Sequence, residues 1–126
     1  MRLKNFNVDY GSKVFRSFSD ISRIRIMNIL YNRKESCIAD LELILNFTQT
    51  KTSRHVNYLK NANLLNMKYV NQFIFYSIRE EALDLIDQIF NLLEKDKQLE
   101  KDLEIYDIMN SNRELSKNKL EILKNK

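Results

Sequence analysis

A chain of 126 residues with a formal net charge of +4 has the length of one domain, or of one domain with an appended helix. Its single glycine, Gly11, and its lack of proline exclude Gly-rich phosphate loops and the GxSxG elbow of serine hydrolases, and they favour long helices. One cysteine and one histidine exclude an intrachain disulfide and a zinc site built from several Cys and His ligands of one chain.

The charges are distributed unevenly along the chain. Residues 1–78 carry a net charge of +7, residues 79–107 carry −6 and residues 108–126 carry +3. A basic front half indicates contact with a polyanion, although charges scattered by chance on solvated faces are the alternative. No apolar run approaches the ~18 residues of a membrane span, so we expect a cytoplasmic protein without a membrane partner.

Helical periodicity is clear from Lys13 onward, whereas residues 1–12 show no clear period and predict an N-terminal arm or a short helix. One face of the first helix carries the apolar residues Val14, Phe15 and Phe18. Asp20 is the expected N-cap of a second helix. The polar residues 32–36 predict a loop.

Two further helices are expected on either side of a short turn. The first covers about residues 38–45 and ends at Asn46, a residue type that tolerates the left-handed conformation after a helix. Thr48 then caps a helix that extends to about Asn61. The pair has the proportions of a helix-turn-helix.

Residues 67–78 change from helical to strand-like character. The segment is rich in aromatic and β-branched residues, and Asn71-Gln72 is the expected hairpin tip because Asn tolerates positive φ. A single buried apolar helix is the alternative. A hairpin directly after the helix pair predicts a winged helix-turn-helix.

A heptad pattern predicts one long helix from Glu80 to about Asn110. Its seam alternates steps of four and three residues: Leu85, Ile89, Leu92, Asp96, Leu99, Leu103, Tyr106 and Asn110. We expect this seam to bury against a partner subunit, with packing on its own domain as the alternative. The last 16 residues are rich in lysine and form one more helix or fray, with four apolar positions to bury: Leu115, Leu120, Ile122 and Leu123.

The second helix of the pair carries side chains that suit DNA. Away from its apolar stripe lie Gln49, Thr50, Lys51, Ser53, Arg54 and Asn57. Arg pairs with guanine, Gln and Asn pair with adenine, and Lys, Ser and Thr contact phosphates. A helix N-terminus adds a dipole and free N–H groups for a phosphate.

Four segments resemble motifs of ArsR-type bacterial repressors. Residues 19–30, SDISRIRIMNIL, are similar to their A-D-P-T-R-L-R-I-L-x-x-L entry helix, and residues 35–41, ESCIADL, to their E-L-C-V-C-D-L metal box. Residues 48–59, TQTKTSRHVNYL, are similar to their S-Q-S-T-V-S-R-H-L-x-x-L recognition helix, and residues 75–78, FYSI, to the V-Y-Y-x-L that ends their wing. The resemblance covers about residues 13–93.

The resemblance implies a mainly α fold with a small β-hairpin, a winged helix-turn-helix with a long C-terminal dimerisation helix. It divides the chain into an arm (1–12), a DNA-binding core (13–79) and a dimerisation helix with a basic tail (80–126). It implies DNA contacts by Gln49, Thr50, Lys51, Ser53, Arg54, His55, Asn57 and Lys60, and on the wing by Lys68, Asn71 and Gln72. It implies a homodimer built from the first and last helices, through Val14, Phe15, Phe18, Leu85, Ile89, Leu92, Leu99 and Leu103.

Two departures from the family pattern matter for function. The metal box of the family places two thiolates one residue apart, but here Ala39 takes the second position and Cys37 stands alone. The other common family site needs a His on the last helix, and residues 80–126 contain none. We therefore expect no cofactor and no metal, with Cys37 as the one residual candidate for a metal ligand. We expect Cys37 to be a small apolar residue at a helix start or, alternatively, a thiol switch.

The wing also lacks the basic tip that is frequent in the family, so more of the DNA affinity should fall on Lys51, Arg54 and Lys60. The sequence thus predicts a homodimeric, sequence-specific repressor that binds a double-stranded DNA operator and responds to an unidentified small-molecule or redox effector. The alternative is a protein-interaction module on a winged-helix scaffold that no longer binds DNA. No paired carboxylates or nucleophile–base pair favour an enzyme.

Overall fold

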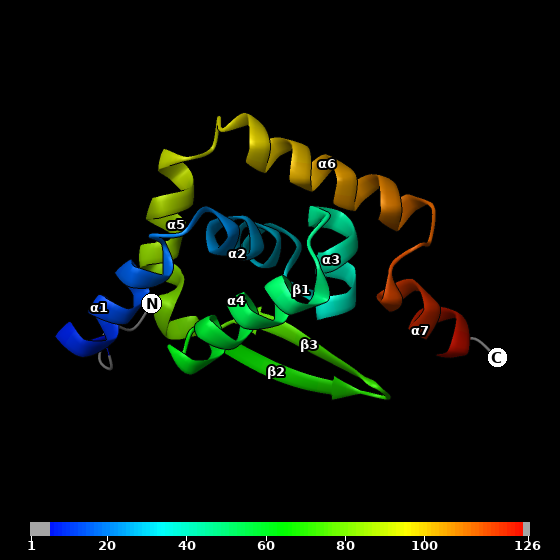
Figure 1. Cartoon of the computed structure of the whole chain (residues 1–126), viewed down its shortest axis with the longest axis horizontal. Helices are drawn as coiled ribbons and strands as arrows, with labels where there is room; N and C mark the ends of the chain where they lie inside the picture. Colours follow the sequence, from blue (N-terminus) through cyan, green and yellow to red (C-terminus); the bar gives the residue numbers. More distant parts are fainter. Residues whose placement is uncertain (1–5, 125–126) are drawn as a thin grey trace.

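A computed structural model describes residues 6–124, with side chains from Phe6 to Leu120. The side chains of Ile122 and Leu123, which we expected to be buried, lie outside the described residues. The helices are α1 (Val8–Ser17), α2 (Ile21–Arg33), α3 (Ile38–Leu45), α4 (Gln49–Asn61), α5 (Leu83–Leu92), α6 (Lys97–Ser111) and α7 (Ser116–Lys124). The strands are β1 (Glu35–Ser36), β2 (Leu65–Val70) and β3 (Phe73–Ile78), which confirms a mainly helical chain with a hairpin (Figure 1).

The expected helix caps are confirmed. The side chain of Asp20 accepts the N–H of Arg23 at 3.2 Å, and Thr48 Oγ1 accepts the N–H of Lys51 at the same distance. Asn46 ends α3 in the left-handed region, with φ 57° and ψ 45°. These local signals fix where α2 and α4 begin and where α3 ends, and so they define the helix-turn-helix.

The first helix begins at Val8, five residues before the expected periodicity at Lys13. Asn7 provides the cap, because its Oδ1 accepts the N–H of Tyr10 at 2.9 Å. The first turn is largely exposed and therefore carries no apolar period that the sequence could reveal.

The hairpin is confirmed, with Val70 opposite Phe73 and Asn71 at φ 54°. The sheet has a third strand that the sequence analysis missed, since residues 32–36 were expected to form a loop. In the order β1-β3-β2, Glu35 pairs with Ser77 and Ser36 with Tyr76, all antiparallel. Two polar residues are too short a segment to show strand alternation.

The single long helix expected over residues 80–110 is wrong. Residues 80–82 form a 3₁₀ turn, α5 ends at Leu92, and residues 93–96 separate it from α6. Asp96 was expected to be a polar position within the seam, but its Oδ1 accepts the N–H of Leu99 at 3.0 Å and caps α6. After α6 the chain forms one more helix, α7, which was one of the two alternatives for the tail.

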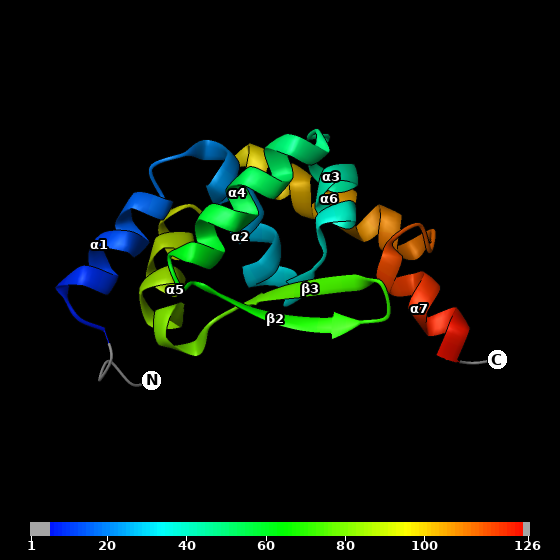
Figure 2. The same cartoon turned by 60° about the horizontal axis from the view of Figure 1, so that its bottom comes forward.

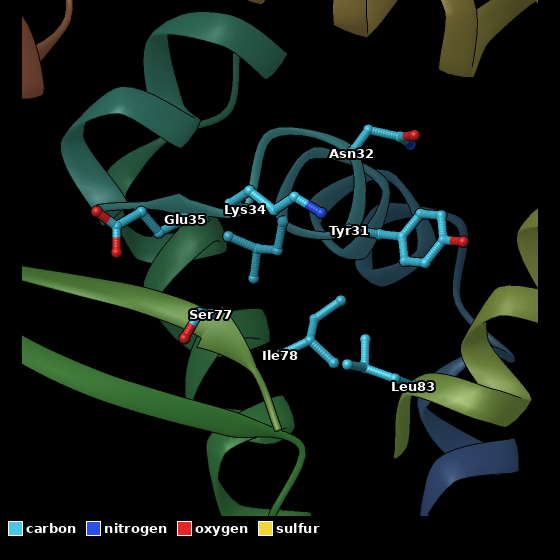
Figure 3. A pocket seen from close by; sticks show the side chains of 8 residues that line it. Tyr31, Asn32, Lys34, Glu35, Ser77, Ile78 and Leu83 are labelled. Carbon is cyan, nitrogen blue, oxygen red and sulfur yellow. The ribbon is translucent and has the colours of Figure 1, made fainter. Parts of the chain in front are cut away.

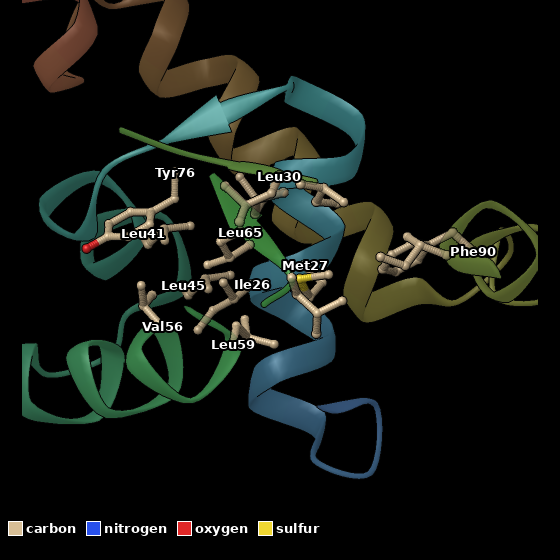
Figure 4. Close-up of a cluster of buried hydrophobic side chains, with 14 of the residues drawn as sticks. Ile26, Met27, Leu30, Leu41, Leu45, Val56, Leu59, Leu65, Tyr76 and Phe90 are labelled. Atoms are coloured by element: carbon tan, nitrogen blue, oxygen red, sulfur yellow. The ribbon is translucent and has the colours of Figure 1, made fainter. Parts of the chain in front are cut away.

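The core lies between the hairpin and the helices α2, α3 and α4, where Ile26, Met27, Leu41 and Leu59 have no exposed surface (Figure 4). The hairpin lies along one side of the helices α2, α3 and α4, and α6 crosses α2 and α3 on the other side (Figures 1 and 2). Of the helices described, none is long and apolar enough to cross a membrane.

Candidate nucleic-acid interface

The helix α4 has a buried stripe and a polar outer face. Thr52, Val56 and Leu59 are fully buried against the core and hold the helix in place. The outer face displays the polar residues that the sequence analysis assigned to DNA, either exposed or partly exposed: Gln49, Thr50, Lys51, Ser53, Arg54, Asn57 and Lys60. One surface of one rigid helix thus presents donors and acceptors of the kinds that read base edges and phosphates.

The N-terminus of α4 is held by a turn packed around Phe47. The ammonium of Lys51 lies 4.1 Å from the Phe47 ring centroid, and the guanidinium of Arg25 lies 5.1 Å from it. The two cations also give the start of α4 a positive surface, which adds to the positive end of the helix dipole.

His55 is the exception among the α4 residues assigned to DNA contact, because it is buried with 5% of its surface exposed. Its Nδ1 lies 3.5 Å from Arg23 Nη1 and its Nε2 lies 3.4 Å from Arg54 Nη2. Burial lowers the pKa of His55, and the charges of Arg54 and Arg23 lower it further against the opposing effect of Asp20. His55 therefore packs as a neutral ring behind the polar face, and its assignment to direct DNA contact is corrected.

Arg23 is a positioning residue that the sequence analysis did not identify. Its Nε donates to the carbonyl of Ser17 and its Nη2 to the carbonyl of Arg16, both at 3.2 Å. Its guanidinium also stacks 3.9 Å above the ring centroid of Tyr58 on α4. Arg23 thus joins the end of α1 to α4. A local sequence pattern could not show this, because Tyr58 lies far from Arg23 in the sequence.

The wing presents few free charges. Lys68 is exposed but its Nζ lies 3.2 Å from the carboxylate of Glu35, and the tip consists of the exposed residues Asn71 and Gln72. Tyr69 is 71% exposed on the same hairpin and was not among the predicted contacts.

Cys37 is buried at the start of α3, as expected for a small apolar residue. Only 2% of its surface is exposed, and it packs with Phe75 of the wing and Leu120 of α7. Burial raises the pKa of the Cys37 thiol, which disfavours the reactive thiolate. Within residues 6–120, no group of three or more His, Cys, Asp or Glu side chains is placed to hold a metal ion.

The residues expected at a dimer interface divide into two groups. Val14 and Leu99 are 0% and 7% exposed and pack within their own chain, so they are corrected to core residues. Phe15 and Leu92 are 62% and 87% exposed. The other expected residues are partly buried: Phe18, Leu85, Ile89 and Leu103. Val8 on α1, 86% exposed, adds an apolar side chain that was not predicted.

Comparison with known proteins decides the family. Residues 20–67, from the cap of α2 into β2, match the sequence model of bacterial regulatory proteins of the arsR family. The arsenic resistance transcriptional regulator ArsR2 of Pseudomonas putida is 32% identical over 79 residues, which are 63% of this chain and 69% of that protein. The chain belongs to the ArsR family.

Other similar proteins agree with this membership. The cadmium resistance regulatory protein CadC of Listeria innocua is 27% identical over 95 residues, covering 75% of this chain and 80% of CadC. A solution structure of the homodimeric winged helix-turn-helix domain of Mb0332 from Mycobacterium bovis has a TM-score of 0.62 at 16% identity. The match covers 71% of this chain and 83% of that one, and it confirms the winged helix-turn-helix fold.

Membership of the family makes the chain a DNA-binding transcriptional regulator. The family consists of regulators and not of enzymes, so the expectation of a non-enzymatic protein is confirmed by its relatives.

Proposed function

We propose that this ArsR-family protein is a repressor that binds its operator as a homodimer, with α4 of each protomer in the major groove. The observation that carries the proposal is the outer face of α4, where seven polar side chains stand opposite a fully buried stripe. A rigid helix with such a face fits the groove, and two copies related by two-fold symmetry read half-sites about 34–36 Å apart.

Within this proposal, residues 13–79 form the DNA-binding core, and the first turn of α1, which begins at Val8, precedes it. Residues 80–126 divide into α5, which contributes to dimerisation, and the helices α6 and α7. Lys68, Asn71 and Gln72 of the wing make secondary contacts beside the major groove, weakened by the pairing of Lys68 with Glu35. Arg54, Lys51 and Lys60 therefore supply most of the charge that meets the phosphates.

The dimer interface is proposed to lie on α1 and α5. Val8 and Phe15 of α1 and Leu92 of α5 expose large apolar surfaces that an isolated protomer would leave in water. The structure of Mb0332 is described as homodimeric, and its fold is shared with this chain.

The first test measures DNA affinity. Arg54→Ala should weaken binding to DNA from upstream of the protein's own gene by about 1–3 kcal/mol, because it removes a base-edge or phosphate contact. Fluorescence anisotropy at several salt concentrations measures this, with Lys119→Ala as the control that removes an exposed charge on α7. Unchanged affinity in Arg54→Ala contradicts the assignment of α4. Absence of any salt-dependent binding would favour the protein-interaction alternative.

The second test measures assembly. Leu92→Glu should convert the dimer to a monomer in light scattering after gel filtration, because it buries an unpaired charge in the interface. Ile108→Glu is the matched control, since Ile108 of α6 is also apolar and 59% exposed but lies outside the proposed interface. A dimer that survives Leu92→Glu and is lost in Ile108→Glu places the interface on α6 instead.

A further inference from the structure

A cavity of about 360 Å³ lies where the end of α2, the wing and the C-terminal helices meet. Its walls come from four separate parts of the chain, represented by Arg33, Lys68, Tyr106 and Lys117. The volume falls within the roughly 300–1,000 Å³ of pockets that hold small ligands. Two of the walls are contributed by α6 and α7, so the cavity exists only because the C-terminal helices pack against the winged core.

The cavity is lined mainly by positive charge. Arg33, Lys34, Lys68 and Lys117 line it, and Glu35 is the one carboxylate among the described lining residues. Lys68 pairs with Glu35 at 3.2 Å, and Arg33 pairs with Asp107 through two bonds of 2.8 and 2.9 Å. These two ion pairs leave the charge of Lys117 in excess over the carboxylates that the structure describes at this place.

Two of the cations converge on one aromatic ring. The Arg33 guanidinium lies 5.8 Å from the Tyr106 ring centroid, and the Lys117 ammonium lies 5.1 Å from the same centroid. Each cation is attracted to the ring. An anion in the cavity would have cations from both α2 and α7 beside it as donors of charge-assisted hydrogen bonds.

The backbone at the edge of the cavity is strained. Lys34 has φ 78° and ψ −53°, a conformation that a residue with a Cβ rarely adopts. Lys34 lines both this cavity and a second one of about 510 Å³, and its side chain extends over the second one towards Tyr31 (Figure 3). Strain of this kind is found preferentially at ligand sites, where the surrounding structure maintains it.

The remaining walls are apolar. Phe75 and Leu120 are 4% and 8% exposed, and Val70 of the wing lies beside them. A lining that combines apolar side chains with cations suits a ligand with a hydrophobic body and one anionic group. We propose that this cavity binds a small organic anion, a carboxylate or phosphate ester carried on an aromatic or similarly flat body.

Occupancy of the cavity would connect the wing to α2 and α7. Lys68 and Val70 lie on β2, so a bound anion would restrain the hairpin relative to the helices. An effect of the anion on operator affinity therefore rests on the DNA-binding mode proposed above, whereas binding of the anion itself does not.

The test uses the full chain without DNA. Salicylate and phenyl phosphate are the probes, and salicylamide is the uncharged control, all at equal ionic strength. We expect saturable amide shifts in NMR spectra, confined to the end of α2, β2 and α7, for the two anions only. Lys117→Ala should weaken the affinity roughly tenfold or more by removing a charge-assisted contact, and Lys117→Arg should retain it.

Lys119→Ala is the matched control, because it removes the same charge from an exposed position on the same helix that does not line the cavity. Equal loss of affinity in the two alanine variants, or equal binding of salicylamide, would overturn the proposal. So would weaker operator binding by Lys117→Ala together with no binding of the free anions, since the cluster would then contact a DNA phosphate.

Discussion

The two sides of α2 are covered by different chemistry. On one side, α4 and the hairpin pack through apolar side chains such as Val56, Leu59 and Leu65, which are at most 5% exposed. On the other side, α6 packs through Leu99 and Tyr106 and also makes polar contacts: Arg25 binds Asp102 through two bonds of 2.8 and 2.9 Å. Asn28 Nδ2 also donates to the carbonyl of Leu99 at 3.2 Å.

The polar side continues beyond α6. Arg33 pairs with Asp107, and the buried carboxylate of Asp40 on α3 accepts the N–H of Ser116 at the start of α7. Apolar packing holds the DNA-binding core together without directional requirements, whereas the attachment of α6 and α7 adds to apolar packing a set of particular polar partners at particular distances. The two sides should therefore respond differently to mutation.

The largest loss of stability is expected from a mutation on the side of α2 that packs against α4 and the hairpin. Leu59→Ala should lower the free energy of unfolding by about 3–5 kcal/mol, because it leaves a cavity in a fully packed core. Urea denaturation followed by circular dichroism measures the change. Leu43→Ala on the exposed face of α3 is the control, with an expected effect within about 0.5 kcal/mol. Similar losses in both variants would mean that the core is not close-packed around Leu59.

Mutations of the polar contacts should lower the free energy of unfolding less, and the loss should depend on which ion pair is removed. Asp102→Ala leaves Arg25 without its partner and should cost about 2–3 kcal/mol, below the ~3–5 of a fully buried pair, because Arg25 keeps 19% of its side chain exposed. Asp107→Ala removes the more exposed ion pair and should cost at most ~1 kcal/mol. The same urea series measures both.

The double variant Arg25→Met/Asp102→Leu sharpens the comparison. If the pair supplies specificity and not net stability, two apolar side chains of similar size should restore most of the stability lost in Asp102→Ala. A double variant as unstable as the single one would mean that the ion pair contributes net stability that apolar packing cannot replace.

This contrast also explains what the sequence could predict. The helix-turn-helix follows from local signals, namely the caps at Asp20 and Thr48, the left-handed residue at Asn46 and an apolar stripe of helical period. The hairpin follows from the turn at Asn71. Each of these signals lies within a few residues of the structure that it determines.

The C-terminal region was predicted less well because its determinants are distant pairs. A regular heptad suggested one helix, yet Asp96 caps a new one and Asp102 meets Arg25, which is 77 positions away. A charged residue in a helix normally indicates a solvated face, so nothing local distinguishes the buried Asp102 from the exposed Asp107. His55 was misassigned for the same reason, since its burial depends on Arg23 from another helix.

The smallest change in stability should come from protonation of His55, a buried polar residue of α4 on the side of α2 that is otherwise packed by apolar side chains. Its folded pKa lies below the ordinary value of about 6.5. As the pH falls through that value, the unfolded chain binds a proton that the folded chain does not, so stability should decrease between pH 7 and pH 5.5. His55 is the single histidine. Burial raises the pKa of Asp20, but backbone N–H bonds and the charges of His55 and Arg23 together lower it below its usual value, so that carboxyl titrates below this range. Urea midpoints across the range should fall for the wild type and stay nearly level for His55→Asn. If the urea midpoint changed equally with pH in the two proteins, the pH dependence would belong to other groups. The protonation of His55 would then have no effect on stability.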